Sequence, residues 1–306
     1  MEPKSFSLVI LNLFVGLMRG HRFLAPTSRH LTDSGYRLWR VEPRIFSRDK
    51  VANPDAAACS TVHSNTLVAE WTHQARPDEG KQQQIRRYCL LSPEDLAGAG
   101  VPVDATDQVD RWLIVAPEAV AEYVRFARDD GLDLLISSFG ASADSPYVLH
   151  PEVGRLKERK LAETIGTTLS FERVPLGYLR FSLDDLSHEG IAEHILPQLV
   201  SFCRKGSGRF TSEHLCAQAI RIWRVLEPSR RDSVARVATR LLSRLKSRKD
   251  AGRWLRRVAD SPPTWEITVP GESPAAVLGM VRRSLDRFVA ELKGEPVQEE
   301  LPFDSD

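Results

Sequence analysis

The chain has 306 residues, of which 42% are hydrophobic and 27% are charged, so it holds enough apolar material for a substantial core, most simply in two domains. This composition excludes a disordered, collagen-like or disulfide-scaffold protein. The net charge is only +1, but thirteen Lys and Arg against three Asp and Glu between Arg221 and Arg257 give that segment a net charge of +10 and leave −9 for the rest. A basic block on an otherwise acidic chain predicts a surface that binds a polyanion.

The four cysteines are widely separated and form no Cys-x-x-Cys pair. The sequence therefore gives no support for a zinc finger or an iron–sulfur cluster and favours a reduced, cytoplasmic protein. The apolar segment Phe6–Met18 is interrupted by polar residues and is shorter than the roughly 20 residues that a membrane span needs. We expect a buried helix there and no contact with a membrane.

Taken in order, the first half of the chain predicts an α/β domain with a mixed sheet over residues 1–150. Hydrophobic periodicity and turn residues give the helix at 6–18, a strand at 35–46, a hairpin of 55–60 and 66–71, a helix at 79–91, a strand at 111–116, a helix at 118–129 and a strand at 132–138. Residues 151–205 are less clear. A charged helix near 155–163, a strand near 177–181 and a helix near 191–203 make this segment an α/β extension or connector.

Residues 206–293 form a basic, mainly helical domain, followed by an acidic tail at 294–306. A capping box, Ser229-x-x-Asp232, begins a helix with one apolar face, and the segments 253–258 and 264–269 resemble a two-stranded wing. Two interpretations stay open: a winged helix-turn-helix, or a plain helical domain whose arginines are solvated. In the first, the predicted nucleic-acid contacts are nine basic residues: Arg230, Arg231, Arg236, Arg240, Arg244, Lys246, Arg253, Arg256 and Arg257.

The first half of the chain also contains a set of residues suited to metal chemistry. A hairpin centred near residues 62–64 places Asp55 opposite Glu70, or within two residues of it, on the neighbouring strand. Two carboxylates a few ångströms apart suit Mg²⁺ or Mn²⁺, completed by waters and a backbone carbonyl such as that of Trp71. The helical spacing of Lys81, Gln84 and Tyr88 puts these three side chains on one face, beside the carboxylates.

Asn53-Pro-Asp55, Glu70 and Gln84-x-x-x-Tyr88 together resemble the RecB-like branch of the PD-(D/E)XK nuclease superfamily, over less than half of the chain. The resemblance implies a restriction-endonuclease-like fold, metal-dependent phosphodiester hydrolysis, and a Gln and a Tyr that help position nucleic acid. The family's lysine, two residues after the acidic one, is Thr72 here. Lys81 lies on the correct helix face to replace it.

Three interpretations follow: an active Mg²⁺-dependent deoxyribonuclease, a non-cleaving nuclease-like DNA-binding or scaffold subunit, or ordinary turn and surface residues that match the motif by chance. The expected setting is bacterial DNA processing, in repair or phage defence. A winged-helix transcription regulator is a further alternative. DNA or RNA and the strandedness of the substrate stay open.

Two observations concern partners. The tail residues Gln298, Leu301 and Phe303 resemble the Q-x-x-L-x-F peptides that bind sliding clamps, where the Leu and Phe fill an apolar pocket. The chain has no nucleotide-binding loop of the G-x-x-x-x-G-K-[ST] type, so any nucleotide hydrolysis has to come from a partner ATPase.

Overall fold

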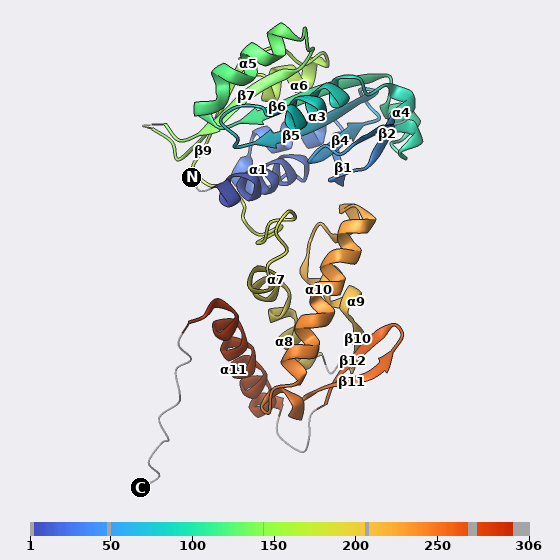
Figure 1. Cartoon of the computed structure of the whole chain (residues 1–306), viewed down its shortest axis with the longest axis vertical. Helices are drawn as coiled ribbons and strands as arrows, with labels where there is room; N and C mark the ends of the chain where they lie inside the picture. Colours follow the sequence, from blue (N-terminus) through green and yellow to red (C-terminus); the bar gives the residue numbers. More distant parts are fainter. Residues whose placement is uncertain (1–2, 48–49, 143, 206–207, 269–273, 296–306) are drawn as a thin grey trace. The chain divides into compact units, whose positions relative to one another are not determined.

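The computed structural model describes residues 3–47, 50–142, 144–205, 208–268 and 274–295 (Figure 1). The chain divides into two compact units. Unit 1 consists of Met1–Tyr178 with Val225–Glu227, and unit 2 of Leu179–Arg224 with Pro228–Asp306. The segment 151–205, expected as one extension or connector, is therefore shared between the two units. Each unit is described by itself.

Unit 1 contains, among its described residues, a mixed seven-stranded sheet in the order β1-β4-β5-β6-β7-β8-β9. The parallel pairs are β5–β6 and β6–β7, and the other neighbours are antiparallel. The strands are β1 (Arg37–Val41), β4 (Ala56–Ser60), β5 (Asn65–Thr72), β6 (Gln108–Val115), β7 (Leu135–Gly140), β8 (Tyr147–Val153) and β9 (Leu169–Phe171). A separate hairpin joins β2 (Ile45–Ser47) to β3 (Lys50–Ala52).

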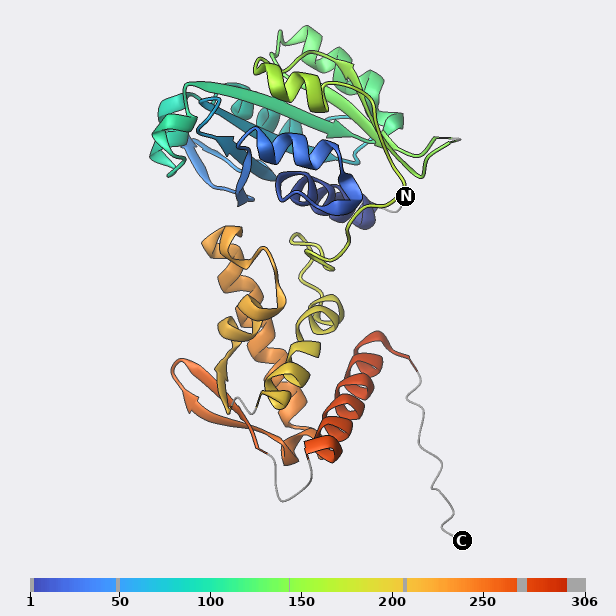
Figure 2. The same ribbon diagram turned by 180° about the vertical axis from the view of Figure 1, so that it is seen from behind.

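Helices cover both faces of this sheet (Figures 1 and 2). One face carries α1 (Pro3–Met18), α2 (Thr27–Asp33) and α6 (Arg159–Ile165), and the other carries α3 (Glu79–Cys89) and α5 (Val120–Asp129). The remaining helical elements of unit 1 are α4 (Pro93–Gly98) and the 3₁₀ turns η1 (Arg22–Leu24), η2 (Val103–Ala105) and η3 (Pro117–Ala119). The expected α/β class with a mixed sheet is confirmed.

The side chains of the central strand β5 alternate between the two faces of the sheet. All eight of its side chains are buried, as in a strand covered on both sides. The Trp71 ring packs on Phe14 of α1, with 6.2 Å between ring centroids, while Val68 packs with Tyr88 of α3. Because side chains alternate along a strand, Glu70 and Thr72 point to the α3 side together with Val68.

Several expected elements change in detail. The strand predicted over 35–46 is divided into β1 and β2 at Glu42, whose φ of +51° interrupts the extended backbone. The strand predicted over 177–181 is wrong, because the Tyr178 N–H donates to the Asn12 side chain at 3.0 Å instead of to a strand. The helix predicted over 191–203 is two helices, because Pro197 starts a new one.

Unit 2 is mainly helical with a small antiparallel sheet in the order β10-β12-β11. The β11–β12 hairpin was expected, whereas β10, at three residues, was too short to be recognised. The elements of unit 2 are α7 (His188–Ile195), α8 (Pro197–Arg204), β10 (Arg209–Thr211), α9 (Ser212–Ala219), η4 (Trp223–Val225, partly in unit 1), α10 (Pro228–Lys246), η5 (Ala251–Arg253), β11 (Leu255–Asp260), β12 (Pro263–Ile267) and α11 (Pro274–Lys293). The core of unit 2 includes the fully buried residues Trp254, Trp265 and Phe288.

Within the described parts of the chain, no helix combines the length and apolarity that crossing a bilayer requires.

Candidate functional site

Asp55 and Glu70 lie side by side at one end of the β4–β5 hairpin. The register pairs Ala56 with Ala69, which puts Asp55 opposite Glu70. The Trp71 N–H donates to Asp55 Oδ2 at 2.7 Å, and the Asp55 N–H donates to Glu70 Oε2 at 3.2 Å. Each carboxylate is thus fixed by the backbone of the other strand, which brings the two acidic groups together.

Lys81 supplies the positive charge at this cluster. Asp78 caps α3 by accepting from the Lys81 N–H at 2.8 Å, which sets the first turn of the helix beside the sheet. The Lys81 Nζ forms an ion pair with Glu70 Oε1 and lies 3.4 Å from Gln84 Oε1. Lys81 and Gln84 therefore share one helix face, as predicted. Thr72 stands at the motif position of the family's lysine but carries no charge, and Lys81 provides the positive charge beside Glu70.

Gln84 and Tyr88 hold the backbone that leads to Asp55. The Tyr88 hydroxyl donates to the Asn53 carbonyl at 3.0 Å, and Gln84 Nε2 donates to the same oxygen at 3.4 Å. Sequence reasoning expected these two side chains to position nucleic acid. In the structure, their hydrogen bonds fix the segment from Asn53 to Asp55, two residues before the carboxylate.

Burial and the neighbouring charges shift the pKa values of the residues in this cluster. Burial and the neighbouring Glu70 charge raise the pKa of Asp55, although part of the residue reaches solvent. Burial opposes the charge of Lys81, but Glu70 and Asp55 outweigh it and raise the pKa of the ammonium. Burial also raises the pKa of Tyr88. Lys81 is thus held as a cation, while Asp55 has an increased affinity for a proton.

The donor set is consistent with a hydrated hard cation. Among the described residues, no group of three or more His, Cys, Asp or Glu is placed to hold a metal. Two carboxylates remain, and Mg²⁺ is usually held by one or two of them with several waters retained. Trp71 contributes through its backbone alone, because its side chain faces α1.

Sequence reasoning missed two residues beside the site. Tyr123 of α5 is fully buried, and its hydroxyl has no hydrogen bond among the described residues, with Thr72 and Lys81 near enough to influence its pKa. Arg111 of β6 donates to the carbonyls of Tyr88 at 2.9 Å and Leu91 at 2.7 Å, which satisfies the C-terminus of α3. Both come from elements after α3, so local spacing gave no signal for either.

Several of the nine predicted nucleic-acid contacts of unit 2 are engaged in ion pairs within the protein. Arg244 is paired with Glu291 at 2.9 Å, Arg257 with Asp260 at 3.1 Å, and Arg230 lies 3.8 Å from Asp184. Arg256 forms an ion pair with Glu266. Lys246 and Arg253 are exposed, and Arg231 is half-buried.

Arg236 and Arg240 differ from these because both line one groove. The groove has a volume of about 840 Å³ and runs between the start of α9, the start and middle of α10 and the tip of the β11–β12 hairpin. Its walls include Thr211 and Pro263 and also the acidic residues Glu213 and Asp232. Arg236 donates only to oxygens of its own helix, including Ser233 Oγ at 3.1 Å. The nine predicted contacts therefore comprise four ion-paired arginines, the groove-lining pair Arg236 and Arg240, and three further residues, Arg231, Lys246 and Arg253.

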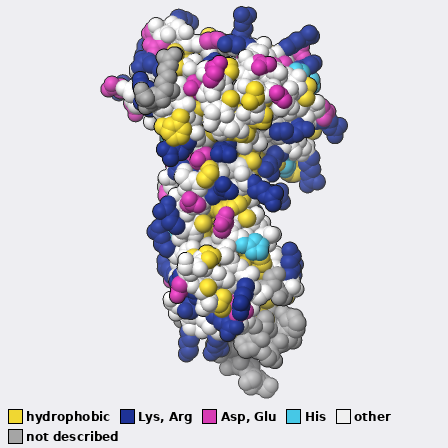
Figure 3. All heavy atoms as spheres, turned by 90° about the vertical axis from the view of Figure 1, so that its right-hand side faces the viewer, with side chains coloured by type: hydrophobic (Ala, Val, Ile, Leu, Met, Phe, Trp, Pro, Cys, Tyr) yellow, Lys and Arg dark blue, Asp and Glu magenta, His cyan; other side chains and the backbone are white. Residues whose placement is uncertain are grey.

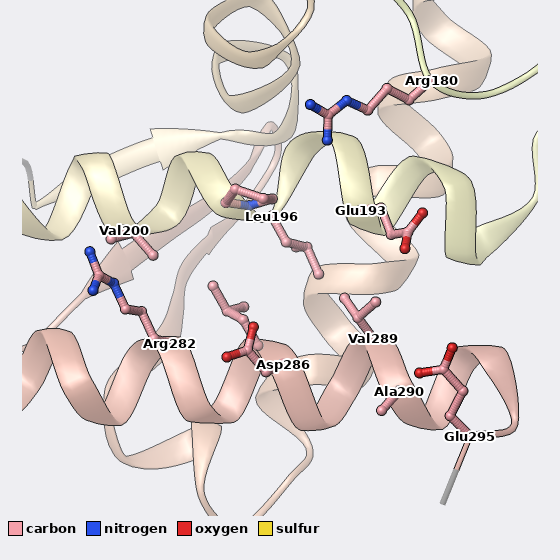
Figure 4. A pocket seen from close by; sticks show the side chains of 11 residues that line it. Arg180, Glu193, Leu196, Val200, Arg282, Asp286, Val289, Ala290 and Glu295 are labelled. Carbon is pink, nitrogen blue, oxygen red and sulfur yellow. The ribbon is translucent and has the colours of Figure 1, made fainter. Parts of the chain in front are cut away.

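A second pocket of unit 2, of about 620 Å³, lies between α7, α8 and α11 (Figure 4). Apolar side chains such as Leu196 and Val289 point into it, and Arg180 and Glu193 lie at its rim. None of the predicted site residues lines this pocket. The predicted clamp-binding residues Gln298, Leu301 and Phe303 lie outside the described residues.

Comparison with protein-family models, with curated proteins and with solved structures finds no match for this chain.

Proposed function

We propose that the chain is a nucleic-acid-processing protein in which unit 1 is a metal-dependent, nuclease-like domain and unit 2 binds the phosphate backbone. The observation that carries this proposal is the position of Asp55 opposite Glu70, where the Glu70 carboxylate accepts from the Asp55 N–H, the Asp55 carboxylate accepts from the Trp71 N–H, and Lys81 contacts Glu70. Carboxylates and a lysine in this arrangement are suited to phosphodiester hydrolysis.

The order of elements supports the nuclease-like interpretation. With α2, the β2–β3 hairpin and α4 between them, a helix, three antiparallel strands, a crossover helix and a parallel strand occur in the order α1, β1, β4, β5, α3 and β6. Asp55 immediately precedes the second of these strands, Glu70 lies near the end of the third, and Lys81, Gln84 and Tyr88 are on the crossover helix. This is the distribution that the resemblance to the PD-(D/E)XK superfamily implies.

The residues of the chain then have the following roles. Asp55 and Glu70 would hold a divalent cation, which would supply Lewis acidity and lower the pKa of a bound water. Lys81 moves its ammonium from Glu70 to a phosphate oxygen and stabilises the charge that develops there. Gln84 and Tyr88 act as positioning residues, because they hold the Asn53 carbonyl and through it the Asp55 backbone.

A non-cleaving DNA-binding or scaffold protein is the second candidate. It is favoured by Thr72 at the motif position and by the engagement of Lys81 with Glu70. A third candidate, a winged-helix regulator, is favoured by the order α8, β10, α9, α10, β11, β12 in unit 2, which is a helix, a strand, two helices and a hairpin. This order supports a winged helix over a plain helical domain.

Plasmid nicking in Mg²⁺ or Mn²⁺ tests the first proposal. We expect Asp55→Asn, Glu70→Gln and Lys81→Met to lower the rate by at least roughly 100-fold, since each removes a charged group from the reaction. The matched controls are the exposed residues Asp104→Asn and Glu118→Gln, which should cleave like the wild type.

Full activity of Asp55→Asn would exclude this site. No cleavage by the wild type, with DNA still bound in a gel shift, supports the second candidate. Tight binding to one defined duplex and weak binding to others supports the regulator.

A further inference from the structure

The β2–β3 hairpin presents one buried face and one outward face. Its register pairs Ile45 with Ala52 and Phe46 with Val51. Ile45 and Ala52 are buried in the same cluster as Tyr88 of α3, so this pair fixes the hairpin to the core. Directly paired residues point to the same side, and successive ones to opposite sides, so Phe46 and Val51 face outward.

Phe46 is unusually exposed for an aromatic residue. It is 64% exposed, against 43% for Phe23, the other exposed phenylalanine in the described parts of the chain. The Arg44 guanidinium lies 5.9 Å from the centre of the Phe46 ring, and both Arg44 and Lys50 are exposed. Figure 3 views the side on which β2 lies in Figure 1. On that side of unit 1, hydrophobic side chains stand among charged ones of both signs instead of forming one apolar patch.

This outward face is connected to the Asp55–Glu70 site by a short, fixed piece of backbone. After β3 ends at Ala52, only Asn53 and Pro54 precede Asp55, and the Asn53 carbonyl is held by Tyr88 and Gln84. Four residues span at most about 14 Å and a cross-strand pair adds about 5 Å, so Phe46 lies within roughly 20 Å of Asp55. A ligand of a few nucleotides covers such a distance.

We propose that the outward face of the β2–β3 hairpin, formed by Phe46 and Val51 with Arg44 beside the Phe46 ring, binds unpaired bases of a single-stranded nucleic acid that leads to the Asp55–Glu70 site. The choice of nucleic acid as the ligand rests on the proposed function. Phe46 provides a flat apolar ring on which a base stacks, and the Arg44 guanidinium beside it attracts a neighbouring phosphate.

The substrate is single-stranded because of the geometry of stacking. Inside a duplex, both faces of each base are covered by neighbouring bases, so an exposed ring has nothing to stack on except at an open end. In a single strand every base has an accessible face, and aromatic stacking is tolerant of sequence. The hairpin therefore makes the protein prefer unpaired strands or tails without reading their sequence.

The experiment measures binding of the whole chain to a labelled oligothymidine and to a duplex of similar length whose two ends are closed by loops of abasic linker. EDTA is present, so cleavage does not interfere. Arg236→Gln and Arg240→Gln are introduced throughout, so binding to unit 2 does not mask the effect. We expect Phe46→Ala to weaken oligothymidine binding roughly 5- to 100-fold and Phe46→Trp to retain it.

Phe23→Ala is the matched control, because Phe23 is also exposed with an arginine, Arg22, 5.0 Å from its ring centre. It lies in η1 between α1 and α2, and its removal should leave binding unchanged. Equal oligothymidine affinity of Phe46→Ala and the wild type overturns the proposal, as does an equal loss on the closed duplex.

These outcomes are independent of the nuclease assay. A protein that cleaves while Phe46→Ala binds normally keeps the proposed function and loses the stacking surface. A protein that never cleaves but needs Phe46 for single-strand binding keeps the surface and loses the hydrolase. Melting temperatures of the Phe46 variants check that the fold is intact, which is expected for so exposed a residue.

Discussion

Two fully buried tyrosines of unit 1, Tyr36 and Tyr123, differ in the partners of their hydroxyl groups. The Tyr36 hydroxyl donates to Glu158 Oε2 at 3.0 Å and accepts from Asn65 Nδ2 at 2.9 Å. Burial raises its pKa, so it stays a neutral donor. The Tyr123 hydroxyl has no such bonds among the described residues. The same side chain therefore stabilises the fold in one place and leaves a polar atom unsatisfied in the other.

The substitutions Tyr36→Phe and Tyr123→Phe should consequently act in opposite directions. Tyr36→Phe leaves Glu158 and Asn65 short of a partner, so we expect the free energy of unfolding to fall by about 1–3 kcal/mol. Tyr123→Phe removes an unsatisfied hydroxyl, so we expect no loss and a gain of up to about 1 kcal/mol. Urea unfolding of the two variants measures both. A loss above about 1 kcal/mol for Tyr123→Phe shows that its hydroxyl is bonded in solution, for example to an ordered water.

At the scale of elements, α7 of unit 2 contains a histidine that the fold keeps neutral. Burial, with Arg180 and Arg221 nearby, lowers the pKa of His194 from 6.5 to about 4. Its ring packs edge-on against Phe181, with 5.8 Å between ring centroids. Because the pKa in the folded protein is below that in the unfolded chain, the stabilisation is complete above pH 6.5 and is lost as the pH falls towards 4.

Acidification should therefore lower the free energy of unfolding through His194 at a higher pH than that at which carboxylates with ordinary pKa values are protonated. Between about pH 7 and about pH 5, we expect the His194 contribution to the free energy of unfolding to fall by roughly 2 kcal/mol. His194→Leu should remove that part of the pH dependence. His188→Gln, an exposed histidine on the same helix, should leave it unchanged. Denaturant titrations of the three proteins at the two pH values measure this change in the free energy of unfolding. An equal change for the wild type and His194→Leu contradicts the prediction.

The elements that bring Asp55, Glu70 and Lys81 together were predictable because each depends on local signals. An apolar run on either side of a turn marks β4 and β5, and an Asp cap with helical spacing marks α3. Tyr123 and the Arg111 contacts were not predictable, because they depend on the parallel pairing of β5, β6 and β7, which a sequence does not specify residue by residue. The wrong strand near 177–181 has the same origin, since the distant Asn12 side chain takes its backbone N–H.

At the scale of the whole molecule, a net charge of +1 combines the basic segment of unit 2 with an acidic remainder. Four of the nine predicted contact residues have an acidic partner, which lowers their attraction for phosphate. Arg236 and Arg240 line the groove, whose walls also include Glu213 and Asp232. Polyanion binding should therefore depend on these two far more than on the total charge.

We expect Arg236→Gln with Arg240→Gln to weaken duplex DNA binding and to lower the slope of log affinity against log salt by about 2, one counterion for each lost phosphate contact. Arg244→Gln with Arg256→Gln removes the same charge from ion-paired positions and should change the slope by less than about 1. Fluorescence anisotropy over a salt series provides both slopes. Equal slopes for the two double variants show that charge alone matters and the groove does not.

The contact of Lys81 with Glu70 has a consequence for how the protein is loaded. A pair of buried acids without a counter-ion destabilises a fold until a metal arrives, so such a protein matures only when the ion is supplied. Here the Lys81 ammonium supplies a counter-charge from within the chain, so folding does not require a metal ion. Under the proposed function, a divalent cation would have to displace Lys81 from Glu70, which would lower the apparent affinity of the site for that cation.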